Sequence, residues 1–165
     1  MHHTEKNTAH ILSLLLKNMP DAMAYLKGSA AYSNVNGTVS FYQTDRGVFV
    51  ITSMHGLPQG TGSCDRPVFA LHIHAGGSCS GNEQDPFANA GSHYNPHNCL
   101  HPYHAGDLSP LFGSGGYAWS GMLTDRFTVE EVIGKTVILH AMPDDFHTQP
   151  AGNSGAKIAC GVIHA

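Results

Sequence analysis

The feature that most constrains this chain is a histidine-rich stretch between residues 71 and 107. It begins with His72 and His74 at the end of an apolar run. Among its later residues are three histidines and a carboxylate that could bind metal, which are His93, His101, His104 and Asp107. Alternate residues of a strand point to the same side, so His72 and His74 present two imidazoles together. Thirteen histidines in 165 residues indicate metal binding before any other function.

The later part of this stretch is the stronger signal. Two histidines separated by one residue in a buried strand are often structural, so His72 and His74 alone are weak evidence. Adjacent imidazoles suit copper, zinc, nickel or iron. Three imidazoles and one carboxylate, from His93 to Asp107, form a reasonable tetrahedral zinc set. With the late His140 added, we interpret these residues as ligands of two metal ions held side by side.

Size and charge exclude several classes of protein. A chain of 165 residues fits one domain with its own core, in which we expect Trp119 and Phe127 to be buried. Hydrophobic residues make up 41% and charged residues 12% of the chain, which argues against long disorder. A net charge of -4 argues against nucleic acid or an anionic membrane surface as a partner. No apolar run approaches the ~18 residues that span a bilayer.

Short runs of alternating apolar and polar residues, bounded by Gly, Pro and Asn, predict seven or eight strands. They lie at 22–26, 38–42, 48–52, 67–74, 117–123, 136–140 and 157–163. Such a pattern favours an all-β sandwich or barrel. The segment 75–116 is predicted to be a long loop, and the segment 141–156 a second loop rich in Pro, Gly and Asp.

Two helical segments accompany the strands. Residues 5–19 have helical spacing of apolar side chains, and we divide the chain into a helical extension at 1–20 and a β-domain at 21–165. A packing helix is the favoured interpretation, and a partner-binding or oligomerising helix is the alternative. Thr128 and Glu131 have the spacing of a capping box that opens one short helical turn.

Five motifs make the chain resemble the copper–zinc superoxide dismutase family, in a bacterial-type form with an N-terminal extension. The resemblance spans about residues 22–163. The motifs are LHIH at 71–74, GSHYNP at 91–96, HAGDL at 104–108, GKTVILH at 134–140 and GAKIACGV at 155–162. The family's fold implies a Greek-key β-barrel of about eight antiparallel strands with long metal-binding loops.

The resemblance also implies two metal cofactors, copper and zinc, and the residues that hold them. The implied copper ligands are His72, His74, His93 and His140, and the implied zinc ligands are His93, His101, His104 and Asp107. His93 would bridge the two ions. Asp144 matches a carboxylate that hydrogen-bonds to one copper histidine and one zinc histidine. The implied reaction is the dismutation of superoxide to oxygen and hydrogen peroxide, with His93, His140 and Lys157 as catalytic residues.

The chain departs from the family pattern near the substrate. The anion-guiding residue is usually arginine, and here it is Lys157, which keeps the charge but loses the two-pronged guanidinium. An insertion at 82–87 lengthens the loop before His93, and the loop at 141–156 is short. We expect activity to survive these changes at a reduced level.

Only one pair among the four cysteines matches the family pattern. Cys79 and Cys160 correspond to its intrasubunit disulfide. Cys64 and Cys99 have no counterpart. A second disulfide between them and a pair of buried free thiols are equal alternatives, because bridging depends on the separation of the Cα atoms.

Three other functions compete with a dismutase. The first is a dismutase-like copper carrier with weak or no turnover, the second a copper-only dismutase, and the third a zinc hydrolase with one ion. The complete ligand sets, with Asp144 and Lys157, argue against the carrier, and the intact zinc set argues against the copper-only enzyme. No carboxylate is left over as the general base that a hydrolase needs. Superoxide is the expected partner, and a homodimer is a candidate assembly. We expect a cytoplasmic location, or an extracytoplasmic one if a leader was removed.

Overall fold

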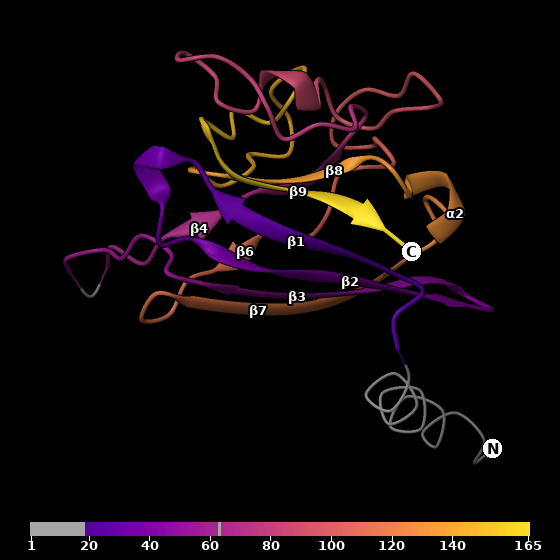
Figure 1. Ribbon diagram of the computed structural model, residues 1–165, viewed down its shortest axis with the longest axis horizontal. Coiled ribbons are helices and arrows are strands. Elements are labelled where there is room, and N and C mark those ends of the chain that lie inside the picture. The colour runs from indigo at the N-terminus through magenta and orange to yellow at the C-terminus, as the bar shows by residue number, and fades with distance from the viewer. Residues whose placement is uncertain (1–18, 63) are drawn as a thin grey trace.

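The computed structural model describes residues 19–62 and 64–165, and Figure 1 shows a curved antiparallel sheet with long loops on one side. Seven strands form the main sheet in the order β5-β8-β9-β1-β2-β3-β7. Their bounds are β1 Ala22–Gly28, β2 Asn36–Thr44, β3 Gly47–His55, β5 Leu71–His74, β7 Tyr117–Thr124, β8 Thr136–His140 and β9 Lys157–His164. The all-β prediction is confirmed.

A second, two-stranded sheet connects the open edges of the first. It pairs β4 (Val68–Phe69) with β6 (Leu111–Phe112). β4 leads into β5 with Ala70 between them, and β6 precedes β7. Since β5 and β7 are the edge strands of the main sheet, the small sheet connects its two edges. The single strand predicted over 67–74 is therefore divided in two, because β4 pairs with β6 and β5 pairs with β8.

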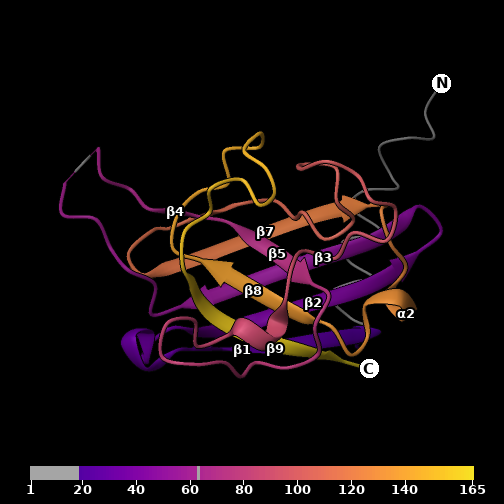
Figure 2. The same cartoon turned by 90° about the horizontal axis from the view of Figure 1, so that it is seen from above.

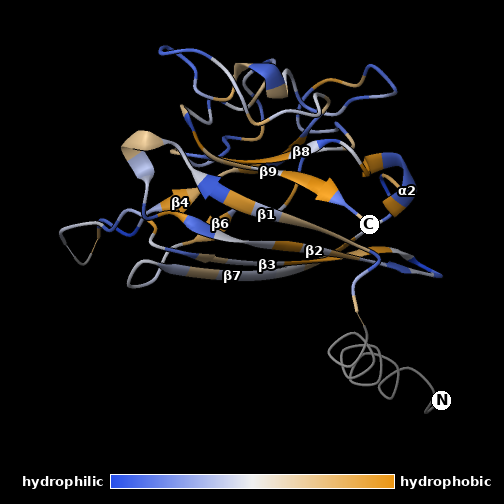
Figure 3. Cartoon of the chain, in the orientation of Figure 1, coloured by the Kyte–Doolittle hydropathy of each residue, from blue (hydrophilic) through white to orange (hydrophobic). Residues whose placement is uncertain are grey.

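The core lies inside the curve of the main sheet. Along β3, Val48, Val50, Thr52 and Met54 are buried while the residues that alternate with them are partly exposed, as expected for a strand with one face inward. Figure 3 shows apolar residues along the strands and mostly polar ones in the loops. Phe127 is buried as predicted, but the prediction for Trp119 was wrong: it is 55% exposed on the outer face of β7.

Three short helical turns complete the described chain: η1 (Ala30–Tyr32), η2 (Ala88–Ala90) and α2 (Val129–Val132). The capping box predicted for α2 is present, since Thr128 N donates to Glu131 Oε2 at 2.6 Å. The helix predicted over 5–19 falls, apart from its last residue, outside the described residues. None of the described helices is long and apolar enough to cross a membrane.

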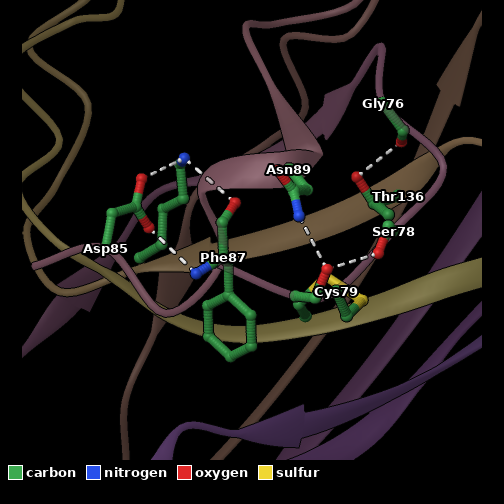
Figure 4. The surroundings of a disulfide bond; sticks show 10 residues. Gly76, Ser78, Cys79, Asp85, Phe87, Asn89 and Thr136 are labelled. Carbon is green, nitrogen blue, oxygen red and sulfur yellow. Dashed lines mark hydrogen bonds and ion pairs between the residues drawn. A yellow bond between two sulfur atoms is a disulfide. The ribbon is translucent and has the colours of Figure 1, made fainter. Parts of the chain in front are cut away.

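The two long loops lie on the same side of the sheet. Figure 1 shows both the segment after β5 and the segment between β8 and β9 on the β8 side, and Figure 2 shows them from above. The predicted disulfide is confirmed: Cys79 in the first loop is bonded to Cys160 in β9, with 5.6 Å between the Cα atoms. It fixes the loop that follows β5 to the last strand (Figure 4).

The second disulfide considered for Cys64 and Cys99 is not formed. Both cysteines are free, and both are exposed rather than buried. Cys99 lies in a turn where its backbone N–H donates to the side chain of Asn95 at 2.9 Å. Neither thiol therefore contributes a covalent link to the fold.

Replacing Cys79 by Ser is expected to destabilise the protein by about 2–4 kcal/mol, because the bridge spans a sequence separation of 81 residues. Replacing the exposed Cys64 by Ser is the matched control, and it should change stability by less than about 0.5 kcal/mol. Urea denaturation of the metal-free proteins without reductant measures both. Equal stabilities for the two variants would contradict this account.

Candidate metal centre

Two neighbouring strands provide three of the predicted ligands. His72 and His74 lie on β5, and His140 ends β8, which pairs with β5 in antiparallel register. All three side chains are buried. The alternation of β5 places His72 and His74 on the same side, while Ile73 faces the apolar core.

The loop that carries the other ligands lies directly on β5. Tyr94 N donates to Ile73 O and Ile73 N donates to Gly106 O, both at 2.8 Å. A Cβ atom at Gly106 would overlap Ile73 O, so this close approach of backbone to backbone requires glycine there. The contact brings His93 beside His74 and Asp107 beside His72.

The structure brings all seven predicted ligands together in two groups that share one member. Within each group the candidate ligand atoms all lie within 4.8 Å of one another. The first group is His72, His74, His93 and His140, and the second is His93, His101, His104 and Asp107. His93 is the residue common to both, and every member is buried.

Asp144 connects the two groups by a hydrogen bond to one histidine of each. Its Oδ2 accepts a hydrogen bond from His72 Nε2 and its Oδ1 accepts one from His101 Nε2, both at 2.8 Å. Burial would raise the pKa of Asp144, but hydrogen bonds from His72, Phe146 and His101 lower it well below its usual range. The ionised carboxylate fixes both imidazoles with their other nitrogen toward the ligand groups.

Backbone carbonyls orient the remaining histidines of the first group. His74 Nδ1 donates to Gly91 O at 2.7 Å, and His140 Nδ1 donates to Gly155 O at 3.3 Å. The opposite nitrogens, both Nε2, lie 3.3 Å apart. In neutral rings these two atoms carry lone pairs that face each other, an arrangement that a shared cation satisfies.

Three further ring nitrogens also indicate bound cations, because they have no hydrogen-bond partner. They are His72 Nδ1, His93 Nε2 and His101 Nδ1, all buried within the described chain. Polar atoms buried without a partner destabilise a protein by about 1–3 kcal/mol each. Since each belongs to a ligand group, the residues fit two metal ions of the kind that imidazole prefers.

Burial also keeps His74 and His140 uncharged. Desolvation is the largest cause and lowers the pKa of His74 to about 2 and that of His140 to about 3. For Asp107, burial would raise the pKa, but the hydrogen bond with His93 and the nearby imidazoles lower it. Neutral imidazoles and an ionised carboxylate are the forms that bind metal.

A cavity of about 900 Å³ opens onto both groups. Its wall includes His74, His93, His104 and His140, and it also includes Lys157. Lys157 is the strand partner of His140 in the β8–β9 ladder. The lysine predicted to guide an anion thus lies on the wall of the cavity that leads to the first group.

Sequence reasoning missed several residues that position the site. The carbonyls of Gly91 and Gly155 carry no side-chain signal at all. Arg126 donates to Pro102 O at 3.1 Å and to His104 O at 3.3 Å, and so it holds the backbone that carries ligands of the second group. Arg126 lies outside the motifs, and its position in the sequence gives no sign of such a contact.

Comparisons with known proteins agree with the geometry. A family model described as copper/zinc superoxide dismutase matches residues 35–163. The Cu-Zn superoxide dismutase of Photobacterium leiognathi is 34% identical over 141 residues, covering 77% of this chain and 78% of that protein. The extracellular Cu-Zn superoxide dismutase of Drosophila melanogaster is 33% identical over 168 residues, with 89% and 87% covered.

Two solved structures are similar in fold. The Cu/Zn superoxide dismutase from Brucella abortus superposes with a TM-score of 0.71 at 23% identity, covering 86% of this chain and 99% of that one. A superoxide dismutase-like protein from Bacillus subtilis gives a TM-score of 0.68 at 29% identity, with 85% and 96% covered.

The metal-free protein is expected to lose stability as the pH falls below about 6.5. The folded-state pKa values of His74 and His140 lie below those of the unfolded chain, so the unfolded state binds more protons. Each histidine should lower the free energy of unfolding by about 1.4 kcal/mol per pH unit, down toward its folded pKa. Urea denaturation at pH 7.5, 6 and 5 measures this slope. His140→Gln should make it shallower, and a flat profile would contradict the prediction.

Replacing Asp144 by Asn should weaken zinc binding by about 10–100-fold. An amide offers one acceptor, so one of the two ring N–H groups of His72 and His101 would face the NH₂ group. Asp145→Asn is the matched control, because the Asp145 side chain bonds only to His147 and Thr148 within its own loop. Competition with a coloured chelator gives both affinities. A loss of equal size in the control would contradict a specific role for Asp144.

Proposed function

The chain belongs to the copper/zinc superoxide dismutase family, and from this membership and the paired ligand groups we infer that it converts superoxide into oxygen and hydrogen peroxide. The observation that carries this conclusion is the sharing of His93 between two complete ligand groups. A protein that bound one ion for structure alone would not need a second group built on the same imidazole.

We propose that the four-histidine group holds copper and that the group containing Asp107 holds zinc. The chemistry of the donors supports this division. Four imidazoles without a carboxylate suit an ion that changes oxidation state, whereas three imidazoles and a carboxylate suit zinc. When bound, copper supplies a one-electron redox couple, so that one superoxide is oxidised to oxygen and a second is reduced to peroxide.

His93 and Lys157 perform the steps that belong to the protein. The Nδ1 atom of His93 faces the second group, 2.8 Å from Asp107 Oδ1, so Nε2 is the nitrogen that can take up a proton and pass it to the reduced product. Lys157 places a positive charge on the cavity wall, which attracts a small anion. His140 and His74 keep their outer nitrogens on backbone carbonyls and so hold the geometry constant during turnover.

A copper carrier with weak turnover is the less supported alternative. A carrier does not require the second ligand group, nor the carboxylate of Asp144 that joins the two. The second ligand group is complete, and Asp144 makes hydrogen bonds of 2.8 Å to both groups. The proteins from Photobacterium leiognathi and Drosophila melanogaster named above are called superoxide dismutases.

The oligomeric state and the compartment stay predictions. Exposed apolar side chains on the outer face of β7, among them Trp119 and Leu123, support a homodimer formed through that surface. The cytoplasmic location rests on the sequence argument alone.

The function is tested by loading the protein with copper and zinc and then measuring metal content and superoxide turnover. One copper and one zinc per chain with rapid turnover is the expected result. His140→Ala should lose copper and activity while keeping zinc, and His104→Ala should weaken zinc binding first. Both metals bound without turnover would favour the carrier, and failure to bind copper would overturn the assignment of the four-histidine group.

A further inference from the structure

The inserted loop at 82–87 has an ordered structure that fixes one carboxylate. Asn82 Oδ1 accepts hydrogen bonds from Gln84 N at 3.0 Å and from Asp85 N at 2.9 Å. Asp85 Oδ1 in turn accepts one from Phe87 N at 3.0 Å. Figure 4 shows the Asp85 carboxylate with one oxygen on the Phe87 backbone and the other on an ammonium group.

That ammonium group is Lys157, the residue that we place at the entrance for superoxide. Its Nζ lies 2.7 Å from Asp85 Oδ2 and 3.2 Å from Phe87 O. Two of its three N–H donors are therefore occupied by the inserted loop. The Lys157 side chain is 16% exposed and that of Asp85 is 38% exposed, so solvent reaches the pair from the carboxylate side.

The pair lies on the wall of the cavity that leads to the four-histidine group. Asp85, Lys157 and His140 all line this cavity. Within the described chain, the other charged side chain on the wall is Lys135, whose Nζ lies 4.6 Å from the centre of the Tyr94 ring. Asp85 is thus the carboxylate that opposes two lysines around the path of an incoming anion.

The charge of Asp85 is secure at neutral pH. Burial would raise its pKa, but the hydrogen bonds from Lys157 and from Phe87 N, together with the charge of Lys157, outweigh that effect and lower the pKa. An anion that approaches the cavity therefore meets an ion pair rather than a free ammonium. To bind Lys157 directly, it must replace the Asp85 oxygen.

We propose that Asp85 is a specificity-determining residue that competes with small anions for Lys157 and so weakens their binding in the cavity. The proposal rests on the function inferred above, because it takes Lys157 as the group that receives superoxide. Other small anions, such as azide and cyanide, would also have to compete with Asp85 for Lys157. The inserted loop would therefore lower both substrate capture and inhibition by such anions.

The two anchors of the loop act at neighbouring points of β9. The disulfide holds it at Cys160, and the ion pair holds it at Lys157, three residues earlier in the same strand. The covalent anchor keeps the loop in place when the ion pair opens. Asp85 can consequently yield to an anion without displacing the rest of the loop.

The test is Asp85→Asn in protein loaded with copper and zinc. Asparagine keeps an acceptor for Phe87 N–H but removes the charge. Azide titration, followed by the visible absorption of Cu(II), should show binding about twofold to fivefold tighter than in the parent, the range expected for losing a partly exposed ion pair. The dependence of kcat/KM on ionic strength should become steeper as well.

Glu83→Gln is the matched control. Glu83 is an exposed carboxylate in the same inserted loop, and the ion pair of Lys157 is with Asp85 instead. It should leave azide affinity unchanged, because it removes the same charge without freeing Lys157. Equal effects of the two substitutions would overturn the proposal in favour of a general effect of loop charge.

A double substitution and a copper-independent readout complete the test. With Lys157→Ala already present, Asp85→Asn should no longer tighten azide binding, and an undiminished effect would overturn the proposal. In zinc-loaded protein without copper, acylation of Lys157 followed by mass spectrometry should be faster in Asp85→Asn than in the parent. Equal acylation rates would overturn the proposal independently of turnover, so its failure is distinguishable from failure of the dismutase assignment.

Discussion

Buried imidazoles that face one another are the constraint on which this structure depends. Six imidazoles and one carboxylate are packed so that their inner ligand atoms converge, and three of the ring nitrogens have no hydrogen-bond partner. Such an arrangement is unfavourable for a protein without cations, because each bare nitrogen was hydrogen-bonded to water in the unfolded chain. The rest of the fold must therefore hold the rings in place against this cost until metal offsets it.

The outer nitrogens show how the fold does so. Each histidine of the first group except His93 donates the N–H that points away from the group to a fixed acceptor. The acceptors are the Asp144 carboxylate, Gly91 O and Gly155 O. These acceptors come from the loop after β5 and the loop between β8 and β9. Both loops are in turn fixed to the rest of the fold by backbone hydrogen bonds, and the first also by Arg126 and by the Cys79–Cys160 bridge. The rigid sheet supplies His72, His74 and His140, and the anchored loops bring the remaining ligands to it.

Sequence reasoning predicted the parts of this arrangement that have a local signature. Alternation identified the strands, and the spacing of His72 and His74 placed both on one face of β5. It failed where the outcome depends on contacts between distant segments. Ala70 separates two strands that pair in different sheets, and Trp119 faces outward although its chemistry favours burial. The Asp85–Lys157 pair joins residues 72 positions apart, and only the folded loop reveals that the predicted anion guide already has a carboxylate partner.

The central claim is that His93 belongs to two metal sites of different composition. Crystals of copper- and zinc-loaded protein, with anomalous diffraction measured at the copper and zinc absorption edges, test it most directly. The account predicts copper among His72, His74, His93 and His140, zinc among His93, His101, His104 and Asp107, and the His93 ring between the two ions. Zinc and copper interchanged, or a single ion with His93 bound through one nitrogen, would contradict it.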